Sequence, residues 1–352
     1  MRRVQLDKIA SVTGRLELSR HAVVGEEIPA RPGTVIAARV LNSKTSYNTL
    51  EDVHGRFVTL HPGDVIAGSL GSRDALYGYS GSVPESVAVG DQLDLLNLGG
   101  VIGSGAQAAP GIGEPFRVEV LGSVLEFPHL DTRVGIPASV ERAALPPARM
   151  PRRTPPVVAL IGTCMDSGKT TAAAVMIAEL ARRGRRVAAG KLTGVALRRD
   201  ILAMEDCGAS PVACFTDFGV VTTTDDNAVA ATHSLVAHLC DADPDLIVLE
   251  MGDGLLGTYG VKALLADEAV RGSLSAVVLC AQDPVGAWGG SQLLADLYDL
   301  RPSLISGRVT DTPVGRRYCR EALEVPAWNA LLDGPAEVLN LLERLEGAEG
   351  AA

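Results

Sequence analysis

The stretch from 162 to 171 holds the residue types that bind the phosphates of a nucleotide. Gly162 and Gly168 let a short loop turn sharply, so that its backbone N–H groups can point at an anion. Lys169 adds a positive charge for the β- and γ-phosphates, and the hydroxyl of Thr170 can reach a Mg²⁺ ion. These residue types, in this order, predict a phosphate-binding loop.

The elements that would position this loop lie on either side of it. An apolar, β-branched run from Val157 to Ile161 is typical of a buried parallel strand. Helix formers from Thr171 through Leu180 place a helix N-terminus, with its partial positive charge, under the phosphates. We expect the nucleotide to be bound by a set of residues in and beside the loop: Gly162, Thr163, Asp166, Ser167, Gly168, Lys169, Thr170 and Thr171.

Two more charged residues follow apolar runs and are candidates for the same site. Lys191 comes directly after a predicted second strand at 186–190, and it is one of only five lysines in a chain that otherwise uses arginine. Glu250 ends the apolar run 245–250 and precedes a glycine-rich segment. A carboxylate at the carboxyl end of a parallel strand can reach a Mg²⁺ ion bound to phosphates. For Lys191 the alternative is a surface lysine that caps a strand.

The spacing of the two glycines narrows the choice of protein families that the loop resembles. Five residues separate Gly162 from Gly168, and Thr163 follows the first glycine. This pattern resembles the G-T-x-x-x-x-G-K-[ST] loop of dethiobiotin synthetase and of the synthetase domain of cobyrinic acid a,c-diamide synthase. The resemblance covers roughly 157–345, and no family is recognised in 1–140.

The resemblance implies roles for three residues outside the loop. Lys191 resembles the family's active-site lysine, and Glu250 resembles the glutamate of its E-G-x-G-G run, although Met251 and Asp253 replace glycines here. Asp253 could supply a further carboxylate for a metal or a substrate amine. Asp200 resembles an aspartate that coordinates Mg²⁺ in these synthetases, but an aspartate that opens an apolar helical run is also an ordinary N-cap.

The resemblance further implies a Mg-ATP-dependent ligase that activates a small-molecule carboxylate or carbamate. The catalytic residues would be Lys169, Lys191 and Glu250, and the metal would be held by Thr170, Asp200 and Glu250. We expect the base to lie over the loop 307–311, with Thr310 and Asp311 as contacts. ATP is favoured because the N-K-x-D signature of related GTPases is missing. The alternatives are a small-molecule kinase and a nucleotide-switched assembly or metallocentre-insertion NTPase.

The order of the apolar runs predicts two domains and a linker. Strand and helix patterns alternate over 157–348, which predicts a doubly wound, mostly parallel α/β sheet, with later strands at 275–280 and 303–306. Residues 1–144 show short apolar runs between Gly, Asp and Pro, which predicts a smaller mainly-β barrel or sandwich that could recognise a substrate or partner. Residues 145–156 are rich in Pro and Arg and read as the linker.

One glycine-rich segment of the first domain is a weak candidate for a second phosphate loop. No helical pattern follows Gly99 to Gly105, so we interpret it as a flexible connection between strands.

Composition excludes several classes of function. The 352 residues carry a formal net charge of −10, which argues against a nucleic-acid partner. The sequence shows no apolar run near eighteen residues and no signal segment, so we expect a cytoplasmic protein without membrane partners. The six cysteines form no C-x-x-C pair and read as reduced thiols. The expected partner is a small-molecule substrate bearing a carboxylate or an amine, and the expected assembly is a homodimer.

Overall fold

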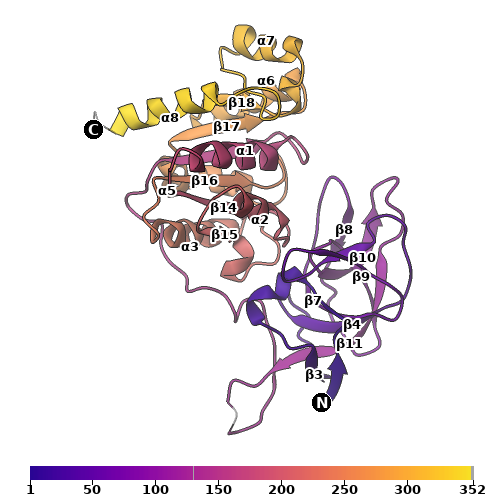
Figure 1. The fold of residues 1–352 in the computed structure, drawn as a ribbon. Coiled ribbons are helices and arrows are strands. Elements are labelled where there is room, and N and C mark those ends of the chain that lie inside the picture. Colours follow the sequence, from indigo (N-terminus) through magenta and orange to yellow (C-terminus); the bar gives the residue numbers. More distant parts are fainter. Residues whose placement is uncertain (130, 350–352) are drawn as a thin grey trace. The chain divides into compact units, whose positions relative to one another are not determined.

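The computed structural model describes residues 1–129 and 131–349, with side chains through 345, and divides the chain into two units (Figure 1). Unit 1 comprises Met1–Pro146 together with Val195–Arg199 and Phe215–Thr222. Unit 2 comprises the remaining residues. The first boundary between the two units, after Pro146, falls inside the stretch 145–156 that we interpret as a linker. The two later segments of unit 1 were not indicated by the sequence.

Unit 1 is mainly β, and five of its strands close into a barrel. Each strand pairs with the next in the cycle β4–β7–β10–β9–β11 and back to β4, and only the β7–β10 pair is parallel. Closure removes the exposed edges that an open sheet would present. The predicted mainly-β domain is therefore confirmed, and of its two forms the barrel is the one observed. The barrel strands are β4 (Val35–Val40), β7 (Val65–Leu70), β9 (Gln92–Leu95), β10 (Val101–Ala108) and β11 (Phe116–Glu126).

The other elements of unit 1 are short and surround the barrel. They are β1 (Arg2–Gln5), β2 (Lys8–Ile9), β3 (His21–Gly25), β5 (Thr49–Glu51), β6 (Phe57–Thr59), β8 (Tyr79–Ser82), β12 (Ile136–Pro137) and the 3₁₀ helices η1 (Ser11–Leu16) and η2 (Phe215–Phe218). Apolar side chains from the barrel strands, such as Val35, Ile66 and Val118, are fully buried and form its core.

The segment Gly99 to Gly105 is not the flexible connection that we expected, because most of it belongs to strand β10. Its glycines have a packing role. A Cβ on Gly103 would come within 2.8 Å of the carbonyl oxygen of Ser82 and of the Leu96 side chain. The glycine therefore allows neighbouring backbone to approach closely, which is a common reason for glycine inside a strand.

Unit 2 contains a six-stranded sheet in the order β15–β14–β16–β13–β17–β18, and every pairing in it is parallel (Figure 1). The strands are β13 (Val157–Gly162), β14 (Val187–Thr193), β15 (Val212–Cys214), β16 (Leu246–Met251), β17 (Ala276–Cys280) and β18 (Leu304–Ser306). The chain starts at a central strand and winds outward in both directions. This confirms the predicted doubly wound α/β fold.

Helices connect these strands. They are α1 (Lys169–Ala181), α2 (Arg199–Asp206), α3 (Ala228–Cys240), α4 (Val261–Ala266), α5 (Glu268–Ser273), α6 (Pro284–Tyr298), α7 (Pro313–Ala322), α8 (Ala336–Glu349) and the 3₁₀ turn η3 (Arg308–Thr310).

Helices cover both faces of the sheet, which explains why its strands are apolar throughout. Val158 and Leu160 of β13 pack in one core with α1 and α8. On the other face α3 packs on β14 and α6 packs on β17. With both faces covered, the loops at the carboxyl ends of the strands are where ligands bind in such sheets.

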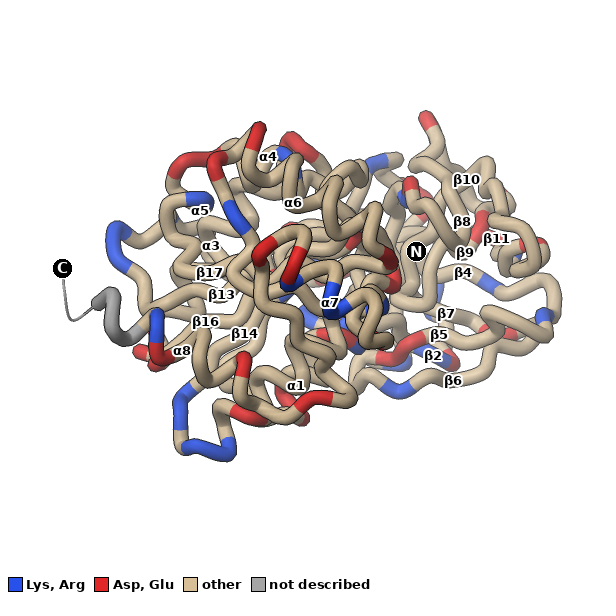
Figure 2. Tube along the Cα trace, turned by 90° about the horizontal axis from the view of Figure 1, so that it is seen from above, with Lys and Arg blue, Asp and Glu red and all other residues tan. Residues whose placement is uncertain are grey.

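Acidic residues outnumber basic ones in the chain, 42 to 32. Acidic and basic positions are interspersed along the trace (Figure 2). None of the helices in the described part of the chain is both long and apolar enough to cross a membrane.

Candidate functional site

The predicted phosphate loop connects β13 to α1 in unit 2. Strand β13 ends at Gly162, and α1 begins at Lys169. Gly168 has φ +96°, a conformation that favours glycine, and a Cβ on Gly162 would lie 2.6 Å from the Lys169 Nζ. Both glycines are therefore required by the local geometry. The loop presents the N-terminus of a 13-residue helix, which is an anion-binding arrangement.

Lys169 is only 5% exposed, and it joins the phosphate loop to the loop that follows β16. Its Nζ donates to the carbonyl oxygen of Cys164 at 2.9 Å and to that of Asp253 at 2.6 Å. A Cβ on Gly254 would lie 2.6 Å from the carbonyl oxygen of Thr163, so the two loops are in close contact. The ammonium group is thus held at the mouth of the phosphate loop by neutral acceptors.

Glu250 lies beside the first turn of α1. The Thr170 hydroxyl donates to its Oε1 at 2.9 Å, because β16 runs next to β13 in the sheet. Oε2 is buried, and it has no hydrogen-bond partner among the described residues. Burial raises the pKa of Glu250, and the positive charge of Lys191 opposes this shift. A buried carboxylate oxygen without a partner calls for an explanation such as an unobserved ion.

Lys191 and Asp200 form a buried ion pair next to Glu250. Lys191 is the register neighbour of Glu250 on strand β14, and its Nζ donates to Oδ2 of Asp200. Burial by itself would lower the pKa of Lys191, but the charges of Asp200 and Glu250 raise it above its usual value. Lys191 is therefore a buried cation within the strand, and the alternative of a surface strand cap is wrong.

Asp200 does not cap helix α2, because it lies one residue inside the helix. Another carboxylate accepts the N–H groups at this helix end. Glu51 accepts from the backbone N–H of Arg198 at 2.8 Å and of Arg199 at 2.7 Å. Sequence analysis missed Glu51, because it stands almost 150 residues earlier in the chain.

Thr170 and Glu250 fit a Mg²⁺ ion. A hydroxyl oxygen and a carboxylate oxygen are the hard ligands that Mg²⁺ prefers, and Mg²⁺ usually takes few protein ligands besides water and phosphate oxygens. The described residues contain no group of three or more His, Cys, Asp or Glu side chains placed to hold a metal. Asp200 is engaged with Lys191, so in this geometry it neutralises a cation close to Glu250.

The loop predicted to face the base lies against the phosphate loop. Gly307 has φ +88°, and a Cβ there would lie 2.1 Å from the carbonyl oxygen of Ser167. Thr310 is fully buried and donates its hydroxyl hydrogen to the carbonyl oxygen of Gly307, whereas Asp311 is exposed. Asn329 donates to both residues, at 3.2 Å to Thr310 Oγ1 and 2.9 Å to Asp311 Oδ1. The loop is thus fixed from two sides.

Two residues of this region were missed by sequence analysis. Asn329 follows a buried tryptophan, and no motif marks it. Gln282 donates from Nε2 to the carbonyl oxygen of Asp166 at 3.0 Å and so supports the outer part of the phosphate loop. A signal for Gln282 existed, because it is the first strongly polar residue after the buried strand β17, as Glu250 is near the end of β16.

The remaining predicted phosphate-loop residues occupy different environments. Ser167 is buried beneath the loop, and Thr163 is half-buried. Asp166 is exposed and has φ +55°, and Thr171 is exposed on the first turn of α1. Their proposed contacts with a nucleotide stay predictions.

Comparison with known proteins gives distant structural neighbours. No family model matches the chain, and no curated protein matches it. Among solved structures, the signal recognition particle receptor FtsY from Elizabethkingia anophelis in complex with GDP aligns at 14% identity and a TM-score of 0.38, over 52% of this chain and 59% of that one. The 54 kDa signal recognition particle protein from Aeropyrum pernix in complex with GDP aligns at 18% identity and a TM-score of 0.36, over 56% and 51%.

A duf1611 family protein from Anabaena variabilis aligns at 15% identity and a TM-score of 0.40, over 55% of this chain and 58% of that one. The chain thus spans roughly half to three fifths of the length of these three neighbours. At such identities and scores they carry no argument about what this chain binds or does.

Proposed function

We propose that the protein is a Mg-ATP-dependent synthetase that activates a small-molecule carboxylate or carbamate by phosphoryl transfer. The observation that supports this most is the placement of two lysines around one buried carboxylate. Lys169 and Lys191 both act electrostatically on Glu250, which also binds the hydroxyl of Thr170. Lys169 is the lysine of the phosphate loop, so Lys191 is a second cation available to the reacting groups.

The two lysines suit different steps of such a reaction. Lys169 would hold the β- and γ-phosphates, as its place at the start of α1 allows. Lys191 would stabilise the charge that builds up on the phosphoryl group during transfer, because its ion pair with Asp200 keeps it protonated. It acts as a fixed cation, since a lysine whose pKa is raised does not serve as a base near neutral pH.

The chemistry then has two stages. A carboxylate oxygen of the substrate attacks the γ-phosphorus, the bond to the β-phosphate oxygen breaks, and ADP leaves. A nucleophile such as an amine attacks the activated carbonyl carbon, and inorganic phosphate leaves. A Mg²⁺ ion held by Thr170 and Glu250 would neutralise phosphate charge. Transfer without the second stage would make the protein a kinase.

The test is nucleotide turnover by the purified full chain with a panel of carboxylic and amino acids. We expect phosphate release from ATP to depend on one small molecule and to form a stoichiometric amount of condensed product. Formation of a stable phosphorylated product would favour the kinase. Turnover that no small molecule stimulates, but that another protein does, would favour a nucleotide-switched protein and contradict the proposal. The small-molecule partner stays a prediction until then, and the homodimer stays a prediction that this assay does not address.

The metal assignment has its own test. Glu250→Gln keeps the shape of the side chain and its bond to Thr170 but removes the carboxylate charge. We expect this variant to need a higher Mg²⁺ concentration for half-maximal turnover, by about tenfold or more. Nucleotide-free protein should also show weaker Mn²⁺ binding by electron paramagnetic resonance. A metal titration identical to that of the parent would remove Glu250 from the metal site.

A further inference from the structure

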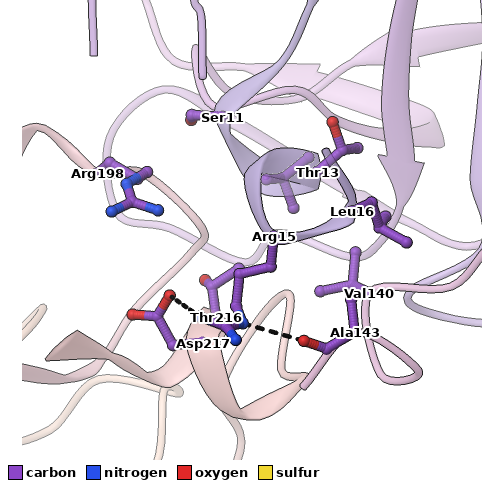
Figure 3. A pocket seen from close by; sticks show the side chains of 10 residues that line it. Ser11, Thr13, Arg15, Leu16, Val140, Ala143, Arg198, Thr216 and Asp217 are labelled. Atoms are coloured by element: carbon purple, nitrogen blue, oxygen red, sulfur yellow. Dashed lines mark hydrogen bonds and ion pairs between the residues drawn. The ribbon is translucent and has the colours of Figure 1, made fainter. Parts of the chain in front are cut away.

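Unit 1 contains a pocket whose polar lining is not explained by the phosphate site (Figure 3). Its enclosed part is small, about 10 Å³, which is room for about one water molecule or one oxygen of a ligand, and the rest of it is open to solvent. Its walls come from η1, from the stretch 140–143, and from the two segments of unit 1 that lie later in the chain. We call it the arginine pocket, and it is lined by Ser11, Val12, Thr13, Arg15, Leu16, Val140, Ala143, Arg198, Thr216 and Asp217.

Thr216 brings a buried hydroxyl without a partner into this pocket. The residue is 8% exposed, and its Oγ1 has no hydrogen-bond partner among the described residues. Leaving a buried hydroxyl unpaired destabilises the folded state, because the group loses its hydrogen bonds to water. A valine of nearly the same shape would avoid that cost, so the hydroxyl suggests a bound group that the pocket is built to receive.

Arg198 brings a half-buried positive charge without a counter-ion. Its guanidinium makes no hydrogen bond or ion pair with any residue in the described part of the chain. Arg15 is different, because its Nε donates to the carbonyl oxygen of Ala143 at 3.0 Å and its NH1 lies 3.9 Å from Asp217 (Figure 3). Asp217 thus lies within ion-pair distance of Arg15, whereas the buried Glu51 carboxylate binds the backbone N–H of Arg198 and not its guanidinium.

The pocket is held in place by hydrogen bonds to its frame. Glu51 is fully buried, and besides the N–H groups of Arg198 and Arg199 it accepts a hydrogen bond from the Ser11 hydroxyl. Asn97 donates to the carbonyl oxygen of Ala196 at 2.8 Å, in the same short segment as Arg198. The backbone that carries Arg198 is thus fixed on the barrel before any ligand binds, which lowers the entropic cost of binding.

The chemistry of the lining selects an anion. Two guanidinium groups repel a metal cation, and the single carboxylate is already paired with Arg15. A water molecule could bond to Thr216, but it would leave the charge of Arg198 unbalanced. Arginine binds carboxylates and phosphates through paired N–H groups, and a threonine hydroxyl donates well to an anionic oxygen.

We propose that the arginine pocket is a binding site for a small oxyanion, either inorganic phosphate or the carboxylate or phosphate group of a small molecule. Arg198 forms the ion pair, and the Thr216 hydroxyl donates the hydrogen bond that fixes orientation. This site is separate from the phosphate loop in its residues, and it does not depend on the reaction proposed above.

The test is calorimetric titration of the full chain with inorganic phosphate and, in a second series, with acetate. Arg198→Ala removes the guanidinium group of the pocket, and Thr216→Val removes its unpaired hydroxyl. Thr216→Val leaves the side-chain volume and every protein hydrogen bond unchanged. We expect Thr216→Val to weaken binding at the pocket by about tenfold and Arg198→Ala to abolish it. The anion that binds more tightly identifies the preferred group.

Matched variants separate the pocket from other effects. Thr232→Val removes another buried, unpartnered hydroxyl, on α3 in unit 2, and it should leave anion binding unchanged. Arg39→Ala removes an exposed arginine of unit 1 that pairs with Glu119, and it should also have no effect. Lys169→Ala removes phosphate binding at the phosphate loop and leaves the pocket intact.

Two results would overturn the proposal. One is that neither phosphate nor acetate binds to the Lys169→Ala chain. The other is that Arg198→Ala, with an unchanged melting temperature, binds as many anions as the parent does and with equal affinity. If Arg198→Ala fails to fold, Thr216→Val decides the question, because it keeps the backbone and every protein hydrogen bond of the pocket.

Discussion

The phosphate loop of unit 2 and the arginine pocket of unit 1 both contain positively charged side chains, but these side chains come from the sequence in different ways. The phosphate loop takes its main residues from one short stretch, 162–171, whose glycines fix the geometry. The arginine pocket takes its residues from η1, from 140–143 and from two segments near 198 and 216. The first arrangement leaves a motif in the sequence, whereas the second leaves none.

The two regions also differ in how their charges are balanced. In unit 2 the cations have partners in the protein, since Lys191 pairs with Asp200 and Lys169 donates to two carbonyl oxygens. In unit 1 Arg198 has no such partner among the described residues. A site whose positive side chains are already paired with protein groups can keep these ion pairs in place while a reaction proceeds. A site with one unbalanced charge is suited to binding alone.

The largest effect that we expect is on turnover in Lys169→Ala. Removing one preorganised group that stabilises the charge of a transition state commonly lowers the rate by about 10²–10³-fold. The rate of nucleotide turnover should therefore fall by at least that factor. The measurement is the rate of phosphate release with Mg-ATP. The control is Lys262→Ala, which removes an exposed lysine on α4 and should turn over like the parent. Equal activity in both variants would show that the phosphate loop is not the reactive site.

Lys191→Arg should have the next largest effect. Arginine keeps the positive charge but brings a larger planar group into a buried position beside Asp200 and Glu250. We expect the single-turnover rate to fall by about tenfold or more, with nucleotide affinity changing less than threefold. A rate like that of the parent would mean that Lys191 serves only to neutralise Asp200. A parallel loss of nucleotide affinity would instead place Lys191 in ground-state binding.

The sequence predicted much of unit 2 and little of unit 1, for physical reasons. Strand β13, the phosphate loop and α1 follow one another in the chain, so local patterns define them. Helix α3 was not predicted. Its own residues are apolar on most sides of the helix, so its sequence shows no amphipathic period. Glu51 and Asn329 bind residues that lie elsewhere in the sequence, and Thr216 lines a pocket with residues from other segments, so only the folded chain brings these groups together.

A smaller effect, on stability, is expected from Glu51→Gln. The buried carboxylate accepts from two backbone N–H groups and one hydroxyl, and an amide can satisfy fewer of these donors. We expect the free energy of unfolding to fall by about 1–3 kcal/mol in denaturant titrations. Glu119→Gln, which breaks only the exposed pair with Arg39, should change it by less than about 1 kcal/mol. If Glu51→Gln lowers stability no more than Glu119→Gln does, Glu51 does not hold the segment that carries Arg198.

The smallest effect concerns Lys44, a lysine of unit 1. The pKa of Lys44 is shifted in the opposite direction to that of Lys191. Burial lowers the pKa of Lys44, and its Nζ donates to the Tyr79 hydroxyl at 2.8 Å. Burial also raises the pKa of Tyr79 from 10.0 to about 12. The folded state therefore prefers the protonated phenol, and this contribution to stability is present below pH 10.0 and is lost as the pH rises through about 12.

Tyr79→Phe removes the titrating group together with the hydrogen bond from Lys44 and the longer ones, both 3.4 Å, to the carbonyl oxygens of Ile112 and Glu114. At neutral pH the variant should be less stable than the parent by about 1 kcal/mol or more, because these hydrogen bonds are lost. Above pH 10.0 the parent loses the contribution of the protonated phenol and the variant does not, so the difference should shrink as the pH approaches about 12. Denaturant titrations across this range measure it, with Tyr77→Phe, an exposed tyrosine, as the control. A difference that stays constant with pH would mean that Tyr79 ionises as readily in the folded chain as in the unfolded one. In that case the burial that lowers the pKa of Lys44 would have no counterpart at Tyr79, unlike the buried pair of Lys191 and Asp200, in which the aspartate raises the pKa of the lysine.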